Sequence, residues 1–367
     1  MKACPTLPIA CLAERRFAMT PLSVVILHNA PVLPADHPDA ASEAGVLDAV
    51  EAVEQALTLR GHAVERLPVG ESSARLIEDL STLRCDAVFN LCEGLGGTGA
   101  GEAAVAGLLE LCGVAYTGCS AETLSLVRDK ARTKWLLAGG GLPTAPFCRV
   151  LADEPLPRAA LAALLEAGPC IVKPAREDAS LGISADSVVT NLPALERQAT
   201  EVRARYGDVL IEQFIDGREF NVGVVMLPEP RLLPIAEIEF AENAGRWKLV
   251  TYNAKWAEDS DECLGTPPRC PADVSPELAA DLGRVALAAT RMTGCRDYAR
   301  VDVRVNERGE PFVLEVNPNP DISPGAGFPR ALAAAGIEYD EFVCRLVEQA
   351  QRRSVPPIAI GGLARHE

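Results

Sequence analysis

Residues 299–317 read ARVDVRVNERGEPFVLEVN, and this stretch decides the fold of the C-terminal part of the chain. Apolar and polar residues alternate on both sides of the turn-rich segment 306–311, a pattern that predicts two antiparallel strands joined by a loop. The simplest register places Asp302 opposite Glu315 and Arg300 opposite Asn317. All four polar side chains then project from one face of the hairpin.

The polar residues on this face of the hairpin indicate a divalent metal site. Two carboxylates directly across a strand pair repel each other unless a cation lies between them. Asp302, Glu315 and the carboxamide oxygen of Asn317 are hard oxygen ligands that suit Mg²⁺, which usually keeps water and substrate phosphates as its other ligands. A solvated hairpin face is the alternative interpretation, but the irregular Asn-Pro-Asn-Pro segment 317–320 favours a site.

Lysines elsewhere in the chain can supply the positive charge that phosphates need. Lys173 ends the apolar strand 170–173 and precedes a small-residue loop at 174–182. A lysine that closes a buried strand is costly unless an anion meets it. Lys130 can add a second charge, although a surface lysine is an equally good interpretation of this residue alone. For Lys134 a surface position is the favoured interpretation.

Segment 209–222 is a second predicted hairpin, with Asp216-Gly217 as its turn and Phe214 opposite Glu219. Glu212 and Glu219 on its strands can accept hydrogen bonds from an adenine amine and from ribose hydroxyls. Taken alone, an exposed glutamate in a hairpin is more often merely solvated.

The N-terminal part has a different pattern, in which strands and helices alternate. Strands are predicted at 22–27, 63–68, 87–91 and 114–116, and helices at 44–60, 73–83 and 102–112, followed by a helical stretch that ends at glycines 139–141. This alternation predicts a parallel, doubly wound sheet.

The sequence therefore predicts a multidomain protein that mixes α/β and α+β classes. An N-terminal parallel α/β sheet precedes a small central α+β domain and a C-terminal antiparallel-sheet domain. The predicted units are a disordered leader at 1–20, the three domains at 21–125, 126–208 and 209–355, and a tail at 356–367. Translation starting at Met19 instead of Met1 would also account for the leader.

Composition excludes several classes of partner. The chain has 367 residues, with 35 Lys and Arg against 51 Asp and Glu, so its net charge is −16. This charge repels nucleic acids and anionic membrane surfaces. No apolar run approaches the length of a membrane span. The 12 Cys form no Cys-x-x-Cys pair and the 4 His are scattered, which argues against zinc and disulfides and for a reducing cytoplasm.

The ordered motifs between residues 22 and 350 resemble the ATP-grasp ligases, and specifically the D-alanine-D-alanine ligase branch. The matching residues are Asp129-Lys130, Ile171 to Pro174, Glu212 to Ile215, Gly217 to Phe220, Arg300 to Asp302 and Glu315 to Asn317. The resemblance implies an ATP-dependent carboxylate-amine ligase that forms an amide through an acyl phosphate and joins two amino acids, or a small carboxylate and an amino acid.

The resemblance also implies roles for individual residues. Segment 250–256 resembles the mobile loop that closes over the phosphates in this family. Arg300 would stabilise the transferring phosphoryl group and the tetrahedral intermediate. Asp302, Glu315 and Asn317 would hold two Mg²⁺ ions, which Mn²⁺ can replace. The implied ATP contacts are Lys130, Lys173, Glu212, Gln213, Phe214, Ile215, Glu219 and Lys255.

The chain departs from the family pattern around the substrates. Glu93 lies near the usual position of a histidine, Ala179 replaces a serine, and Trp256 replaces a tyrosine of the lid, so a hydrogen-bonded tether between lid and substrate is missing. These departures point to a related amino acid, or to another small carboxylate and amine. The candidate substrate contacts are Glu43, Glu93, Ser180 and Gly325. Ser180 and Lys255 are also candidate catalytic residues, together with Arg300. Glu43 fits a helix N-terminus equally well.

Two other functions compete with a ligase. Residues 94–99 match the GxGxxG pattern of NAD-dependent oxidoreductases, but they follow the third predicted strand, and no acidic residue ends the next strand. An ATP-binding sensor or interaction protein without ligase activity is the second alternative. A homodimer is expected from the family resemblance alone.

Overall fold

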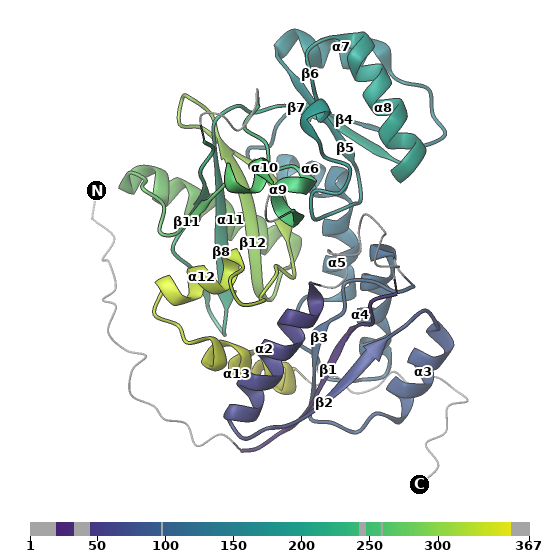
Figure 1. Ribbon diagram of the computed structural model, residues 1–367, viewed down its shortest axis with the longest axis vertical. Coiled ribbons are helices and arrows are strands. Elements are labelled where there is room, and N and C mark those ends of the chain that lie inside the picture. The colour runs from purple at the N-terminus through teal and green to yellow at the C-terminus, as the bar shows by residue number, and fades with distance from the viewer. Residues whose placement is uncertain (1–19, 33–44, 97, 242–246, 258–259, 354–367) are drawn as a thin grey trace.

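The computed structural model describes residues 20–32, 45–96, 98–241, 247–257 and 260–353, which form three sheets with their helices (Figure 1). The predicted leader lies outside these residues except for its last residue, Thr20. The predicted tail and Glu43 also lie outside them. Among the helices of the described residues, none combines the length and apolarity that a bilayer span requires.

The N-terminal sheet is parallel, as the strand-helix alternation predicts. Its strands β1 (Ser23–Asn29), β2 (Ala63–Val69) and β3 (Ala87–Leu91) are ordered β2-β1-β3. The predicted strand 114–116 is reduced to an isolated bridge between Tyr116 and Val88. Around this sheet lie α2 (Val46–Leu59), α3 (Ser73–Thr82), η1 (Gly99–Gly101), α4 (Glu102–Leu111) and α5 (Ala121–Arg128).

Two glycines after β3 approach neighbouring residues closely. A Cβ on Gly94 would lie 2.5 Å from the carbonyl oxygen of Thr98, and one on Gly101 would lie 2.3 Å from the side chain of Leu95. These close approaches exclude larger residues. Within the GxGxxG match, Gly94 is therefore required by local packing, and Gly96 has a left-handed backbone with φ of 62°.

A single helix predicted through residues 120–139 is divided into two by Asp129. Asp129 ends α5 with an extended backbone, and its carboxylate accepts a hydrogen bond from the N–H of Arg132 (3.1 Å), which caps α6 (Lys130–Gly139). Asp is a favoured residue at this position because it satisfies a free helical N–H group. The division places Lys130 at the first position of α6.

The central sheet is antiparallel, with strand order β4-β7-β5-β6. Its strands are β4 (Phe147–Val150), β5 (Cys170–Pro174), β6 (Val188–Val189) and β7 (Val209–Gln213), and its other elements are α7 (Arg158–Ala167), η2 (Ala185–Ser187) and α8 (Leu192–Tyr206). Side chains from α7 and α8 form one apolar cluster with this sheet.

The predicted hairpin at 209–222 is wrong, because its two strands belong to different sheets. β7 pairs with β4 and β5, whereas β8 (Arg218–Met226) belongs to the C-terminal sheet. The chain crosses between the sheets at 214–217, where Gly217 is required because a Cβ would lie 2.0 Å from the carbonyl oxygen of Val305. The Asp-Gly pair therefore marks a crossover and not a hairpin turn.

The C-terminal sheet has the order β11-β10-β8-β12-β13, and β9 pairs with β8. The predicted register is confirmed at its centre, with Arg300 opposite Asn317 and Asp302 opposite Glu315. A bulge after Asp302 shifts the remaining pairs by one residue. The elements are β9 (Pro230–Leu232), β10 (Ala236–Ile238), α9 (Tyr252–Trp256), α10 (Asp261–Leu264), β11 (Pro268–Arg269), α11 (Pro276–Thr293), β12 (Asp297–Val305) and β13 (Pro311–Asn317).

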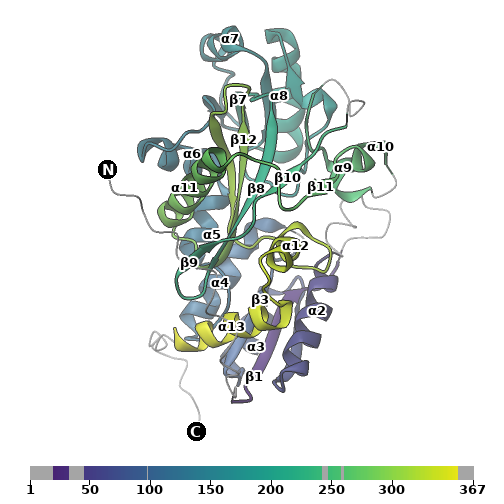
Figure 2. The ribbon, with the colours of Figure 1, turned by 90° about the vertical axis from the view of Figure 1, so that its left-hand side faces the viewer.

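Of the last two helices, α12 (Gly327–Ala334) contacts β8 and α13. Helix α13 (Tyr339–Arg352) returns to the N-terminal sheet, although it falls inside the predicted C-terminal unit. α13 packs against α2 and β3 (Figures 1 and 2). Buried Asp297 at the start of β12 accepts hydrogen bonds from Arg353, Gln349 and the N–H of Gly118. This network fixes the N-terminal sheet to the sheet that carries the charged hairpin.

Candidate active site

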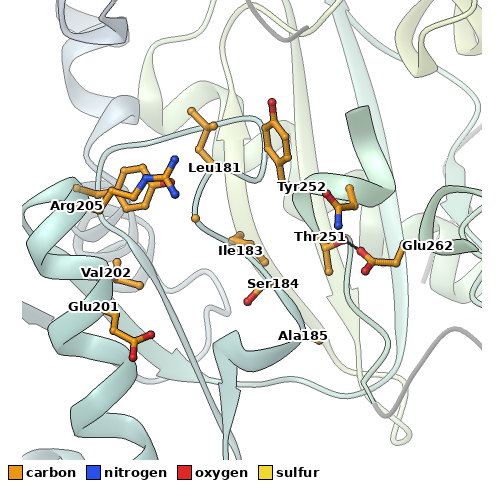
Figure 3. A pocket seen from close by; sticks show the side chains of 13 residues that line it. Leu181, Ile183, Ser184, Ala185, Glu201, Val202, Arg205, Thr251, Tyr252 and Glu262 are labelled. Atoms are coloured by element: carbon orange, nitrogen blue, oxygen red, sulfur yellow. Dashed lines mark hydrogen bonds between the residues drawn. The ribbon is translucent and has the colours of Figure 1, made fainter. Parts of the chain in front are cut away.

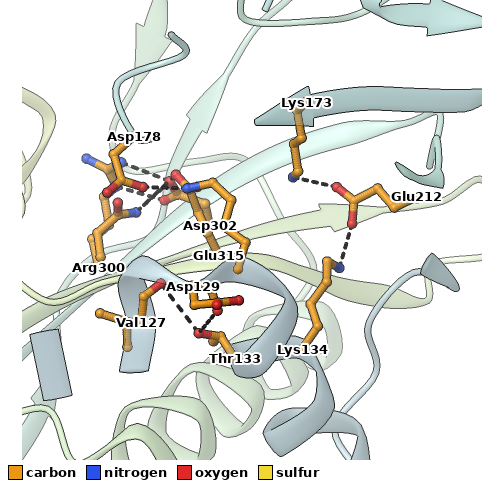
Figure 4. A network of polar contacts seen from close by, with 12 residues as sticks. Val127, Asp129, Thr133, Lys134, Lys173, Asp178, Glu212, Arg300, Asp302 and Glu315 are labelled. Atoms are coloured by element: carbon orange, nitrogen blue, oxygen red, sulfur yellow. Dashed lines mark hydrogen bonds and ion pairs between the residues drawn. The ribbon is translucent and has the colours of Figure 1, made fainter. Parts of the chain in front are cut away.

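The predicted charged residues meet on the face of the C-terminal sheet that is turned away from α11 (Figure 4). Arg300 donates two hydrogen bonds to Asp302, at 2.7 and 2.8 Å. Lys130 reaches them from the start of α6 and lies 3.2 Å from Glu315. Asp178, from the loop after β5, forms a further ion pair with Lys130. The structure thus brings together phosphate-binding and metal-binding candidates from four segments.

Neighbouring charges favour the ionised forms of Glu315 and Lys130. Burial would raise the pKa of Glu315, but attraction to Lys130, Lys173 and Arg300 outweighs it and holds the pKa well below its usual value. The pKa of Lys130 is raised because Asp178 and Glu315 together outweigh its desolvation. Each cation is therefore neutralised by a carboxylate. When nucleotide binds, its phosphates would pair with the cations, and a metal ion would pair with the carboxylates.

The donor set fits Mg²⁺. Asn317 donates through Nδ2 to Asp302 (2.9 Å), and Asn221 donates to the other oxygen of the same carboxylate (2.7 Å), so the metal candidates already form one hydrogen-bonded group. Asp302 and Glu315 lie opposite each other and offer two carboxylates. Magnesium typically takes one or two carboxylates and completes its shell with phosphates and water.

Glu212, a predicted adenosine contact, lies buried between two lysines. Its carboxylate is 2.7 Å from Nζ of Lys134 and 2.5 Å from Nζ of Lys173. Burial would raise the pKa of Glu212, but the two ammonium groups outweigh it and lower the pKa. Lys134 contacts its Oε2 atom and Lys173 its Oε1 atom, so each oxygen has an ammonium partner. A carboxylate oxygen has more than one lone pair, so each can also accept a hydrogen bond from a base amine.

The favoured interpretation of Lys134 as a surface residue is wrong. Only 1% of its side chain is exposed, and its ammonium group contacts Thr144 and lies 5.6 Å from the ring of Phe147. Desolvation lowers the pKa of Lys134, and Glu212 offsets part of this effect. The sequence gives no local signal for the burial, because the partners come from other segments of the chain.

Arg304 organises the predicted adenine segment, and the sequence analysis missed it. It donates to the carboxylate of Glu219 at 2.7 and 3.0 Å and to the carbonyl of Ile215 at 3.0 Å. Its guanidinium also lies 5.0 Å from the ring of Phe214. The signal was available, since alternation along β12 places Arg304 on the face that carries Arg300 and Asp302. Gln213, by contrast, donates its side-chain amide to the carbonyl of Ala167.

The predicted lid forms the short helix α9. Thr251 caps it by accepting a hydrogen bond from the N–H of Ala254 (3.1 Å). Lys255 retains exposed surface, yet desolvation within the cleft and repulsion by Arg300 lower its pKa, while Glu315, Asp321 and Glu93 oppose the change. Lys255 therefore interacts with the charges of the site, and its contact with the phosphates stays a prediction.

Several carboxylates lie close to Glu93, a predicted substrate contact. Desolvation, followed by repulsion from Asp321, raises the pKa of Glu93 to about 7. Desolvation also raises the pKa of Glu102 to about 8, although Asn319 donates a 3.0 Å hydrogen bond to it. Two further substrate candidates lie on loops: Ser180 has a left-handed backbone after β5, and exposed Gly325 accepts a hydrogen bond from Arg330.

We expect Glu102→Gln to stabilise the protein increasingly as pH rises. The folded-state pKa of Glu102 is about 8, above its ordinary value of 4.5, so its contribution is fully present below pH 4.5 and is lost as pH rises through about 8. Glutamine keeps the acceptor for Asn319 but never ionises. Thermal unfolding at pH 5 and pH 8.5 should show a larger gain over wild type at pH 8.5. Glu122→Gln, at an exposed position, is the control, and a gain independent of pH would contradict the prediction.

Comparisons with known proteins define the class first. The solved structure of D-alanine–D-alanine ligase from Bacillus anthracis complexed with ATP matches with a TM-score of 0.72 at 21% identity, covering 90% of this chain and 98% of that one. This likeness confirms the predicted ATP-grasp fold.

Sequence similarity then gives the family. The family model described as D-ala D-ala ligase C-terminus matches residues 136–348. D-alanine–D-alanine ligase from Desulforudis audaxviator is 36% identical over 82% of this chain and 92% of that protein. An uncharacterized protein, y4sG, from Sinorhizobium fredii is 34% identical over 72% of this chain and 75% of its own. The chain belongs to the D-alanine–D-alanine ligase family, whose members are ATP-dependent ligases that form carbon–nitrogen bonds, and the oxidoreductase alternative is thereby excluded.

Proposed function

We propose that this ligase activates a small carboxylate with ATP and joins it to the amine of an amino acid. The observation that carries the proposal is the pairing of Asp302 and Glu315 across β12 and β13, with Arg300 and Lys130 in contact. A pocket that holds opposed carboxylates beside cations suits metal-bound phosphates. Magnesium bound by Asp302, Glu315 and Asn317 would neutralise charge on the phosphates, and Mn²⁺ is a suitable substitute.

The reaction proceeds in two balanced steps. A carboxylate oxygen of the first substrate attacks the γ-phosphorus, and the bond to ADP breaks. The amine nitrogen of the second substrate then attacks the acyl carbon, phosphate leaves, and the nitrogen loses a proton. Lys130, Lys173 and Lys255 orient the phosphates, while Arg300 stabilises negative charge on the transferring group and on the tetrahedral intermediate.

Recognition of adenosine follows from the buried groups of the cleft. Glu212 offers a carboxylate oxygen to the base amine in addition to its ion pairs with Lys134 and Lys173. The backbone of 213–215, held by Arg304, lines the adenine slot. Glu219 would meet the ribose hydroxyls through the carboxylate oxygen that Arg304 does not use. A homodimer and a cytoplasmic location also remain predictions.

The substrate end favours an ammonium group. Glu93 presents a carboxylate near the position where the family usually has a histidine, and Asp321 adds negative charge close to it. Binding of an ammonium ion would lower the raised pKa of Glu93. A D-amino acid such as D-alanine fits this proposal, and so does a related amino acid.

The test incubates the protein with ATP and Mg²⁺ and with pairs of D- and L-amino acids. Phosphate release is measured together with amide products by mass spectrometry. We expect phosphate release that depends on one or more pairs, with an amide of matching mass. Nucleotide binding without amide from any pair would support the ATP-binding sensor instead.

A further inference from the structure

The lid helix is fastened at both ends to the loop that follows β5. At its first residue, the N–H of Tyr252 donates to the carbonyl of Ile183 at 3.1 Å. At its last residue, the indole N–H of Trp256 donates to the carbonyl of Ala179, also at 3.1 Å. The two hydrogen bonds join segments 179–183 and 252–256 in antiparallel order. The second bond uses a side chain, so substitution can remove it.

These bonds matter because α9 is not packed tightly along its first residues. A cavity of about 340 Å³ lies between the lid, the loop and α8 (Figure 3). Thr251, Tyr252 and Asn253 line it on the lid side, opposite Val202 and Arg205 of α8. Packed side chains therefore contribute little on this side of the lid.

The acceptor for Trp256 is fixed by the backbone. Ala179 and Ser180 both adopt left-handed conformations, with φ of 55° and 60°. Such conformations are costly outside glycine and persist where surrounding contacts maintain them. The hydrogen bond to Trp256 is one such contact. Because the acceptor is a main-chain carbonyl, the missing hydroxyl at position 179 does not weaken this bond.

Trp256 also contacts the neighbouring phosphate-binding candidate. Nζ of Lys255 lies 5.2 Å from the centre of the Trp256 ring. An ammonium group at this distance is attracted by the electron-rich face of an indole. The attraction counteracts repulsion between Lys255 and Arg300, which lowers the pKa of the lysine. Fixing Trp256 therefore also restrains the direction of Lys255.

We propose that Trp256 is a positioning residue that latches the lid through its indole N–H, replacing a side-chain tether with a bond to the main chain. The role in catalysis rests on the proposed ligase function. A latched lid keeps water from the acyl phosphate, whose hydrolysis would consume ATP without forming an amide. The latch therefore determines how much ATP is hydrolysed for each amide formed.

The test is Trp256→Phe, which keeps an aromatic ring beside Lys255 and removes only the donor. Loss of one hydrogen bond of ordinary strength should lower kcat for amide formation by about 5- to 10-fold. The ratio of phosphate released to amide formed should rise, because water competes for the acyl phosphate. A purely structural role would lower both products together and leave this ratio unchanged.

Trp135→Phe serves as the control, because it changes an exposed tryptophan on α6. This variant should keep the wild-type ratio. An increased ratio in Trp135→Phe equal to that in Trp256→Phe would overturn the proposal.

Hydrogen–deuterium exchange of the nucleotide-free protein separates the latch from the ligase. We expect the amides of 252–256 to exchange about 5- to 10-fold faster in Trp256→Phe than in wild type. Unchanged exchange together with an unchanged ratio would refute the latch. Absence of any amide from the wild-type protein would instead refute the ligase function, while the exchange result would still decide whether the latch exists.

Discussion

Glu315→Gln is expected to abolish magnesium-dependent amide formation. Glutamine preserves the size of the side chain but removes the charge that faces Asp302 across the hairpin and pairs with Lys130. Metal stabilisation of a transferring phosphoryl group is worth several kcal/mol, so kcat should fall by about 10³-fold or more. Phosphate release and amide formation, measured as a function of Mg²⁺ concentration, provide the readout.

The fold should survive this change. Lys130 keeps Asp178 as a partner, and Asp302 keeps Arg300, Asn221 and Asn317. Thermal unfolding without nucleotide therefore separates a metal role from general damage. Glu310→Gln, on the exposed turn of the same hairpin, is the matched control and should keep wild-type kcat. Wild-type turnover by Glu315→Gln would remove Glu315 from the proposed metal shell.

The hairpin that carries these residues could be predicted because its information is local. Alternation of apolar and polar residues with a period of two sets the faces of both strands, and a short loop restricts the register. Asp302 and Glu315 are accordingly opposite each other, as predicted. The bulge after Asp302 lies outside such reasoning, because the sequence there does not differ from a regular strand.

Segment 209–222 shows where local reasoning fails. Asp216-Gly217 has the composition of a two-residue turn, but Gly217 is needed for its close approach to Val305 in another strand. β7 pairs with strands of the central sheet, and no residue within 209–222 encodes that choice. Turn chemistry identifies a place where the chain changes direction, and the partner of each flanking strand depends on distant segments.

The buried ion pairs could not be predicted from local sequence patterns either. No residue near Lys134 in the sequence indicates that it is buried. Its counter-ion, Glu212, belongs to β7, and its hydroxyl partner, Thr144, precedes β4. The family resemblance named Glu212 as a nucleotide contact without naming the lysine beside it. Charge burial is decided by the fold as a whole, because only a correctly placed partner makes it tolerable.

This buried group leads to the largest expected effect on stability. Glu212→Gln leaves Lys134 and Lys173 beside each other without their shared counter-ion. Removing one partner of a buried ion pair typically costs about 3–5 kcal/mol, since the remaining charge is desolvated and uncompensated. We expect a loss of this size in the free energy of unfolding, measured with urea at pH 7 without nucleotide.

The double variant Lys134→Met with Glu212→Gln provides the decisive comparison. Methionine fills the volume of Lys134 with an apolar side chain beside Phe147, so the uncompensated buried ammonium disappears. If loss of the ion pair causes the destabilisation, the double variant should be more stable than Glu212→Gln alone. The losses in free energy of unfolding of Lys134→Met and Glu212→Gln should then not add. Strict additivity would mean that Lys134 and Glu212 do not interact. The proposed contact of Lys173 with nucleotide phosphates should persist in the double variant, because its ammonium group is retained. Selectivity for adenine over guanine should fall, because the Glu212 carboxylate is lost.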